Sequence, residues 1–359
     1  MKTYCLLLLV ASFISVHADP LRLVQDQGAQ TISVLRPDSD KPILVQNARS
    51  DHRPYVHPIV APDGNGVLTQ YSPGHHKHQT GIYWGFTRVN GRDYFHNPSD
   101  GYWQLQEANI LVGEGEVVQW ETVYHMLDED GEAIMEETQV WFIRDNGDEY
   151  FVDLIWTSRA HTDIIISEYR YGGLFVRMPW DDSKEGEIVN SARQKNKRAE
   201  QQRSSWVNIG MQIDGRDPDD WGHIAIFDHP ENDAYPMPWR VDRQMGAGPA
   251  RSILGDWEIP AGSSKTYKHR FVVYTGRLND IHLNEDWKAY SGERYDRAAW
   301  FQARAEAKEA EFLTGEQAIE KMTVPDGLEV TLVTSEPQIT QPMAFCWDDR
   351  GRLWIAENR

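Results

Sequence analysis

The chain has 359 residues, a length that accommodates about two domains. Hydrophobic residues make up 40% of the sequence and charged residues 25%, which is the composition of a globular protein. The 55 acidic side chains outnumber the 36 basic ones and give a formal net charge of -19. Because like charges repel, this balance argues against nucleic acid as a partner.

The first 18 residues have the pattern of a secretory signal peptide. Lys2 gives a short positive region, the apolar stretch "YCLLLLVASFISV" follows, and "VHA" places small residues before a cut after Ala18. The apolar stretch is short for a bilayer span and no later run is apolar enough, so we expect no transmembrane span in the mature chain. Cys5 leaves with the peptide and Cys346 remains alone, which favours a bacterial periplasm or cell surface over a eukaryotic secretory route.

Residues 20–284 are expected to form an all-β domain, a large antiparallel β-sandwich. Segments such as "VVQWETVYHML" and "YFVDLIWTSRA" have apolar residues at every second position or continuously. Asn146-Gly147 favours a hairpin turn in which both central residues have positive φ. The length favours a sandwich of the kind seen in sugar mutarotases. The polar segment 181–205 is expected to be a long surface loop that closes over one end.

The sequence changes character after residue 284. Residues 285–322 are expected to form a helical linker, because 296–313 is rich in Ala, Glu, Lys and Arg. Thr314 and Gln317 match a capping box at the start of a second helix. Residues 323–359 return to β-structure and are shorter than one propeller blade, so they predict the start of a truncated propeller-like domain.

Three stretches of the sandwich region together resemble one family. They are "RPYVHPIVAPDG" (53–64), "HHKHQTGIYWGFTRVNGRDYF" (75–95) and "IAIFDHPENDAYPMPW" (224–239). They resemble an exported bacterial family of unknown function whose members often carry the label "methane oxygenase PmoA". The reaction in that label conflicts with the sequence, because a membrane methane monooxygenase subunit needs several long apolar spans.

The tail resembles a second family. Its sequence "VPDGLEVTLVTSEPQITQPMAFCWDDRGRLWIAENR" is similar to the first strands of the β-propeller proteins known as membrane-bound or sorbosone-type dehydrogenases. Leu328 stands where those proteins usually have an aromatic residue. The match covers only the start of a domain, so it implies no active site.

The densest polar motif is "GHHKHQTGIYWG". If residues 76–83 form a strand, His76 and His78 share one face and reach one cavity, which we predict to be shared with Asp228 or His229. Three interpretations stay open. The histidines are ligands of a copper or zinc ion, they perform general acid/base chemistry, or they only hold loops by hydrogen bonds.

The resemblance implies further site residues. We take His76, His78, Asp228 and His229 as catalytic candidates. Where the family often has an acidic residue before a glycine pair, this chain has Tyr171, which puts a carboxylate role there in doubt. The candidates for substrate binding are Arg53, Tyr55, His57, Gln79, Arg170, Arg177 and Trp239.

The sequence therefore predicts an exported β-sandwich that binds or processes a carbohydrate or another small polar ligand, with histidine acid/base chemistry as one form. One alternative is a non-catalytic sugar-binding module attached to a dehydrogenase-like propeller, and another is a metal-dependent oxidoreductase. No G-x-S-x-G, H-E-x-x-H, P-loop or dinucleotide fingerprint occurs, which argues against the enzyme classes that use them. The sequence leaves cofactor and metal unidentified.

Overall fold

The computed structural model of the chain describes residues 20–293, 296, 313–335, 338–339 and 342–357. The chain divides into two compact units, Met1–Gln302 and Ala303–Arg359, and each is described by itself. The expected signal peptide lies outside the described residues. Of the expected helix over 296–313, only the first and the last residue are described. Within the described ranges, no helix has the length and apolar character needed to cross a membrane.

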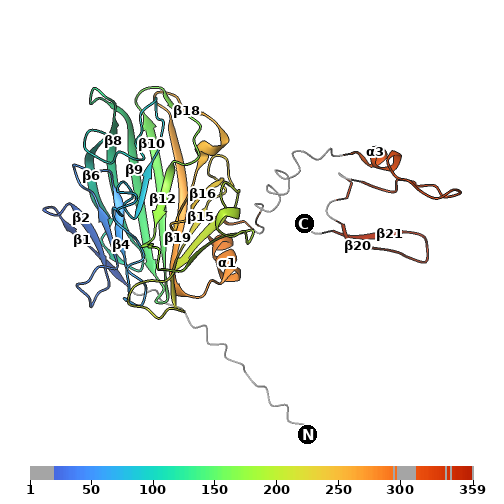
Figure 1. The fold of residues 1–359 in the computed structure, drawn as a ribbon, viewed down its shortest axis with the longest axis horizontal. Coiled ribbons are helices and arrows are strands. Elements are labelled where there is room, and N and C mark those ends of the chain that lie inside the picture. The colour runs from blue at the N-terminus through green and yellow to red at the C-terminus, as the bar shows by residue number, and fades with distance from the viewer. Residues whose placement is uncertain (1–19, 294–295, 297–312, 336–337, 340–341, 358–359) are drawn as a thin grey trace, which may run out of the picture. The chain divides into compact units, whose positions relative to one another are not determined.

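The first unit is a sandwich of two antiparallel sheets (Figure 1). The strands of the first sheet are β1 Leu21–Asp26, β2 Thr31–Leu35, β3 Leu44–Asn47, β4 Tyr55–Ile59, β5 Ile82–Gly85, β7 Glu114–Gly115, β12 Gly173–Arg177, β16 Trp239–Asp242 and β17 Gly246–Pro249. They lie in the order β16-β17-β12-β5-β4-β3-β2-β1-β7. We call this layer the nine-stranded sheet.

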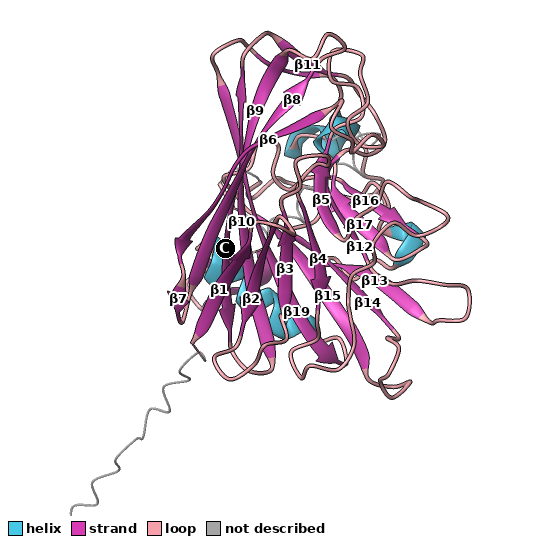
Figure 2. Cartoon of the chain, turned by 90° about the vertical axis from the view of Figure 1, so that its left-hand side faces the viewer, coloured by secondary structure: helices cyan, strands magenta, loops and turns pink. Residues whose placement is uncertain are grey.

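The strands of the second sheet are β6 Trp103–Val112, β8 Val118–Leu127, β9 Ala133–Asp145, β10 Glu149–Ala160, β13 Gly186–Asn190, β14 Trp206–Met211, β15 Trp221–Asp228 and β19 Ser264–Gly276. They lie in the order β13-β14-β15-β19-β10-β9-β8-β6 and form the eight-stranded sheet. This unit also contains a two-stranded sheet of β11, Ile164–Ile166, and β18, Trp257–Ile259. A short 3-10 helix, η2, spans Arg251–Leu254. Strands make up nearly all of its regular structure (Figure 2).

Two packed antiparallel sheets were predicted from the sequence, and this prediction is confirmed. β8 and β9 alternate between buried and part-exposed residues, because one face of each strand packs on the core and the other faces water. Trp84 of β5 stacks on Trp156 of β10, with ring centroids 4.4 Å apart and an interplanar angle of 10°. This contact joins the two sheets through the core.

The predicted hairpin at Asn146-Gly147 is confirmed, but the turn type predicted for it is wrong. The Asn146 N–H donates to the Glu149 carbonyl over 2.9 Å between β9 and β10. Gly147 has φ 87°, whereas Asn146 is not among the residues with positive φ. One left-handed glycine therefore closes a longer loop than the predicted two-residue turn.

The expectation of an irregular loop over 181–205 is wrong. β13 lies within this segment and pairs with β14 along its whole length, and a short 3-10 helix, η1 Asn196–Arg198, follows. Ile188 and Val189 are buried although most of the segment is polar. Because β13 is an edge strand, it tolerates charged residues that an interior strand would exclude.

Helix α1, Asp280–Ser291, packs against the eight-stranded sheet (Figure 1). Its buried residues Leu283 and Trp287 join a cluster with side chains from β10, β14, β15 and β19. The Asn279 side chain caps the helix by accepting a hydrogen bond from the His282 N–H. The helix starts before residue 285 and belongs to the unit that contains the sandwich.

The second unit contains helix α3, Gly315–Glu320, and a hairpin of β20, Pro342–Trp347, and β21, Leu353–Glu357. The predicted capping box is confirmed. The Thr314 hydroxyl accepts from the Gln317 N–H, and the Gln317 side chain accepts from the Thr314 N–H over 2.8 Å. That this unit begins a propeller stays a prediction.

Candidate functional site

The histidine motif forms a turn, so the predicted strand over 76–83 is wrong. The His76 N–H donates to the Pro73 carbonyl (2.9 Å) and the Gln79 N–H to the His76 carbonyl (3.0 Å), and β5 starts only at Ile82. Next to the turn, Gly81 has φ 74°, and a Cβ there would lie 2.2 Å from the Val56 carbonyl oxygen. Glycine is required at this point. We call residues 74–79 the histidine turn.

A fully buried arginine holds the histidine turn from one side. Arg53, just before β4, donates to the His78 carbonyl and, over 2.6 Å, to the Phe95 carbonyl. Its guanidinium lies 3.8 Å from the ring centroid of Tyr83 in β5. Burial lowers the pKa of Arg53 to about 10, so the side chain remains charged at neutral pH. Arg53 therefore positions the turn from beneath.

A second buried arginine holds the other side of the turn. Arg177, the last residue of β12, donates to the Gln79 side chain and the Gln244 carbonyl, and it pairs with Asp242 over 2.9 Å. Burial acts to raise the pKa of Asp242, but the charge of Arg177 keeps it below its ordinary value. Both arginines were predicted to bind substrate, and the structure places both behind the residues that line the cavity.

Three imidazoles meet above the nine-stranded sheet. The ring centroids of His76 and His78 are 5.7 Å apart, and those of His78 and His96 are 4.5 Å apart. Burial, with the nearby charge of Arg53, lowers the pKa of His78 to about 3. Burial and Arg177 lower the pKa of His76 as well. His76 and His78 are therefore neutral at pH 7.

His96 lies between a carboxylate and a phenol. Its Nδ1 is 2.7 Å from Asp93 Oδ2, and its Nε2 is 3.2 Å from the Tyr171 hydroxyl. Asp93 fixes the proton on Nδ1, which leaves Nε2 as an acceptor that receives the Tyr171 hydroxyl. Burial raises the pKa of Tyr171 to about 12, so this phenol stays protonated and donates. We call these three residues the His96 relay.

The His96 relay opens into a cavity of about 90 Å³, here called the inner cavity. Its lining residues are His76, His78, Gln79, Phe95, His96, Arg170, Tyr171, Phe175, Arg240 and Asp242. A larger cavity of about 670 Å³, the outer cavity, shares His76, Arg240 and Asp242 with it. The two cavities are therefore adjacent parts of one candidate site.

Of the predicted site residues, His76, His78, Gln79 and Arg170 line the inner cavity. The others lie elsewhere. Tyr55 packs its ring in an aromatic cluster on the outer face of the sheet, beneath the turn. His57 bonds through Nδ1 to the Thr69 hydroxyl over 2.9 Å. Trp239 is fully buried and donates to the Ser204 carbonyl, which makes it a packing residue.

Asp228 and His229 do not line this site, so the predicted shared cavity is wrong. Asp228 ends β15 in the eight-stranded sheet, whereas the histidine turn lies over the nine-stranded sheet. The buried Asp228 carboxylate accepts hydrogen bonds from the Asn232 side chain (2.7 Å) and the Met237 N–H (2.9 Å). Burial raises its pKa to about 7. The ring of His229 lies edge-on to Tyr290, 5.0 Å away.

Sequence reasoning missed the residues that complete the site. His96 directly follows the stretch 75–95 that carries the family resemblance, and its spacing from Asp93 was the available signal. Asp242 and Arg240 follow the third stretch in the same way. Tyr171, the departure from the family pattern, supplies the hydroxyl that bonds to His96.

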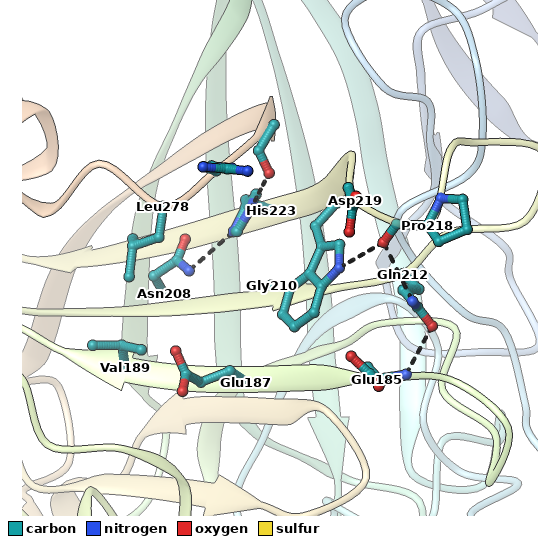
Figure 3. A pocket seen from close by; sticks show the side chains of 13 residues that line it. Glu185, Glu187, Val189, Asn208, Gly210, Gln212, Pro218, Asp219, His223 and Leu278 are labelled. Carbon is teal, nitrogen blue, oxygen red and sulfur yellow. Dashed lines mark hydrogen bonds between the residues drawn. The ribbon is translucent and has the colours of Figure 1, made fainter.

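A separate cavity of about 310 Å³ lies on the eight-stranded sheet (Figure 3). Its histidine, His223, uses both ring nitrogens, one toward Asn208 (3.2 Å) and one toward the Gly276 carbonyl (3.1 Å). Burial lowers the pKa of His223 to about 4. In contrast, His76 Nδ1 in the candidate site is buried without a hydrogen-bond partner. The candidate site is therefore the one with uncommitted imidazole nitrogen.

Two groups in the described part of the chain have the side-chain types and spacing for a metal ion. They are His125, Glu136 and His161, and Glu149, His282 and Asp286, with ligand atoms within 4.8 Å of one another in each group. The three imidazoles of the candidate site are not such a group.

The fold and the site define a class: an antiparallel β-sandwich with a histidine-rich cavity on the outer face of one sheet. The chain belongs to the family of unknown function DUF6807, whose model matches residues 40–288. The domain of unknown function DUF7133 matches residues 314–359. Neither description includes a methane oxygenase or a propeller, so what those labels imply stays a prediction. No curated protein matches the sequence.

Some solved structures are distantly similar. The GH36 α-galactosidase AgaB from Geobacillus stearothermophilus is 10% identical at a TM-score of 0.37, with 71% of this chain and 41% of that chain covered. A putative aldose 1-epimerase from Klebsiella pneumoniae subsp. pneumoniae MGH 78578 is 8% identical at a TM-score of 0.37, with 74% and 84% covered. This chain thus spans about two fifths of the α-galactosidase.

Proposed function

We propose that the sandwich binds a carbohydrate in the inner and outer cavities and that His96 moves a proton on it. The observation that carries this proposal is the His96 relay. Asp93 holds the imidazole through Nδ1 at 2.7 Å, and Nε2 lies beside the Tyr171 hydroxyl at the inner cavity. The imidazole of His96, oriented by the Asp93 carboxylate, is a proton acceptor. The protonated phenol of Tyr171 beside it is a proton donor, so the site holds both in one place.

The walls of the inner cavity suit a sugar. Phe95, Phe175 and Tyr171 offer apolar ring surfaces, and the histidines, Gln79 and Asp242 offer polar atoms. A sugar ring has apolar C–H faces and a rim of hydroxyl groups, so it matches walls of both kinds. The outer cavity, about 670 Å³, falls within the range of roughly 300–1,000 Å³ that small-molecule sites occupy.

The reaction that this arrangement supports best is the interconversion of the anomers of a reducing sugar. When the sugar binds, its anomeric hydroxyl replaces the Tyr171 hydroxyl as the donor to His96 Nε2, and the Tyr171 hydroxyl donates to the ring oxygen instead. The proton of the anomeric hydroxyl then passes to His96 Nε2 while the bond between the anomeric carbon and the ring oxygen breaks, and Tyr171 gives its proton to that oxygen. Ring closure from the other face returns both protons. The neutral His76 and His78 hold the sugar by hydrogen bonds.

The test uses the full chain with a panel of reducing sugars. Binding is measured by isothermal titration calorimetry, and anomer exchange is measured by NMR. His96→Gln should bind sugar and lose about 10²–10⁴-fold in exchange rate. His75→Gln is the matched control, because His75 is exposed on the same turn and lines neither cavity.

The outcomes separate the alternatives. Binding without exchange by the unaltered protein would indicate a non-catalytic sugar-binding module. If no sugar of the panel binds, the proposal is refuted. An equal loss of rate in the His75 and His96 variants would remove the special role of the relay.

We also propose export to the periplasm or cell surface, supported by the signal-peptide pattern of residues 1–18. Expression in a bacterium, followed by N-terminal sequencing of the periplasmic fraction, should give a chain that starts at Asp19. Recovery of an uncleaved chain from the cytoplasm would contradict this.

A further inference from the structure

The site has a charge opposite to that of the whole protein. The chain has a formal net charge of -19. The charged residues that line the outer cavity are mainly basic, and the inner cavity adds a further arginine. The basic residues are Lys184, Lys197, Arg240 and Arg243 in the outer cavity and Arg170 in the inner one, against the acidic residues Glu200 and Asp242.

The two acidic residues that line the cavities are already neutralised, and the third acidic residue of the site, Asp93 of the His96 relay, lines neither cavity. Glu200 pairs with Arg240 over 2.6 Å, and Asp242 pairs with the buried Arg177 over 2.9 Å. Lys184 pairs with Asp214 over 2.9 Å, outside the lining. The remaining positive charge of the site therefore comes from other residues.

Three basic side chains remain without an ion pair among the described residues: Arg170, Lys197 and Arg243. All three are exposed. Exposed basic residues are common singly, but three around one concavity of a strongly acidic protein create a local positive potential. Such a potential attracts an anionic ligand and would repel a cationic one.

We infer that the site takes an acidic carbohydrate, one that carries a carboxylate or a sulfate ester. This inference rests on the proposed carbohydrate function and names the substrate class. The Arg170 and Arg243 guanidiniums present the planar donor pairs that bind such oxyanions. Neutral sugars would leave these charges uncompensated in the complex.

The test compares three probes that differ only at one carbon: glucuronate, glucose 6-sulfate and glucose. Calorimetry with the full chain at low and high salt should show that at least one of the two anions binds roughly tenfold tighter than glucose, since hydrogen bonds to charged groups are stronger than those between neutral groups. The advantage should shrink at high salt. The stronger anion identifies the carboxylate or the sulfate ester as the recognised group.

Variants connect the preference to the site. Arg243→Gln and Lys197→Gln should each reduce the affinity for the preferred anion several-fold, and by a larger factor than the affinity for glucose. Lys77→Gln is the control, because Lys77 is exposed on the histidine turn and lines neither cavity. Glucose binding as tight as either anion would overturn the inference and leave the proposed function intact. Failure of all three probes and of the neutral panel would overturn both.

A different observation carries a second inference, at the eight-stranded sheet. His125 of β8 lies directly opposite Glu136 of β9, with Nε2 and Oε2 3.6 Å apart. The ring of His161, which follows β10, lies 5.4 Å from that of His125. His161 Nδ1 is 3.2 Å from the Ala133 carbonyl, which fixes its proton there and leaves Nε2 as a ligand atom.

We propose that His125, Glu136 and His161 bind a divalent transition-metal ion such as Zn²⁺, with positions left for water. Two imidazoles and one carboxylate are a ligand set that Zn²⁺ prefers. The ligands lie at the same end of three adjacent strands, so the sheet sets their spacing. The site is independent of the candidate functional site.

Titration of the full chain with Zn²⁺, measured by isothermal titration calorimetry, tests this proposal. His125→Ala and His161→Ala should each weaken Zn²⁺ binding at least tenfold. His282→Ala, in the other group with metal-ligand spacing, is the matched control and should leave this binding unchanged. Zinc binding with unchanged affinity and stoichiometry in both His125→Ala and His161→Ala, or no binding by the unaltered chain, would overturn the proposal.

Discussion

Replacing Arg177 by methionine removes a charge that the protein encloses. The Arg177 side chain is 0% exposed and that of Asp242 is 9% exposed. Methionine fills much of the same volume, so the cost comes mainly from the carboxylate left behind. Removing one partner of a buried ion pair costs about 3–5 kcal/mol. Asp242 keeps a hydrogen bond from the Gln244 N–H (2.8 Å), so we expect the lower end, about 3 kcal/mol.

Urea unfolding of the full chain, monitored by tryptophan fluorescence, measures this loss in the free energy of unfolding. The matched control is Arg49→Met. Arg49 pairs with Asp51 over 2.7 Å, and their side chains are 40% and 54% exposed. A pair that water screens in this way contributes at most about 1 kcal/mol, so the control should lose far less. Sugar affinity should also fall in Arg177→Met, because Gln79 loses its anchor.

A loss below about 1 kcal/mol for Arg177→Met, or equal losses for both variants, would refute this reasoning. A double variant separates charge from packing. Adding Asp242→Leu removes the stranded carboxylate, so the double variant should regain part of the lost stability. A double variant less stable than Arg177→Met alone would show that packing carries the effect.

Three further outcomes are expected. Burial raises the pKa of Glu137 from its ordinary value of 4.5 to about 7, so the folded protein keeps a proton that the unfolded chain releases, and Glu137 should contribute a fall in stability of about 3 kcal/mol as the pH rises between these values. Glu137→Gln should remove this contribution in urea titrations at several pH values and leave that of the buried Asp228, whose pKa is also raised to about 7, and an unchanged slope would refute the assignment to Glu137. Gly81→Ala should cost more than about 2 kcal/mol, because the new Cβ would meet the Val56 carbonyl. Gly64→Ala, with φ 80° and open space around it, should cost only about 1 kcal/mol in the same assay, and equal costs would count against the steric argument.

The sandwich could be predicted because its signals are local. In β8 and β9 every second side chain is buried, and this alternation is visible in the sequence. The capping box at Thr314 is local in the same way, since its two partners are three residues apart. Each of these signals needs only a few consecutive residues.

The site could be predicted only in part, because distant residues decide its geometry. The histidine turn is held by Arg53, 25 residues before His78, and by Arg177, 98 residues after Gln79. A strand pattern fits 76–83 equally well until those contacts are known. The motif around Asp228 looked like a partner of the histidines, but it is part of the opposite sheet.

Arg53 and Arg177 hold the histidine turn by hydrogen bonds to a backbone carbonyl and a side-chain amide, and this affects the rate of ligand binding. Because Arg53 lies just before β4 and Arg177 ends β12, the sheet sets the shape of the turn before any ligand arrives. A ligand then meets a surface that needs little reordering on binding. Related sugars should therefore associate at similar rates, and the time each remains bound should decide which one the protein retains.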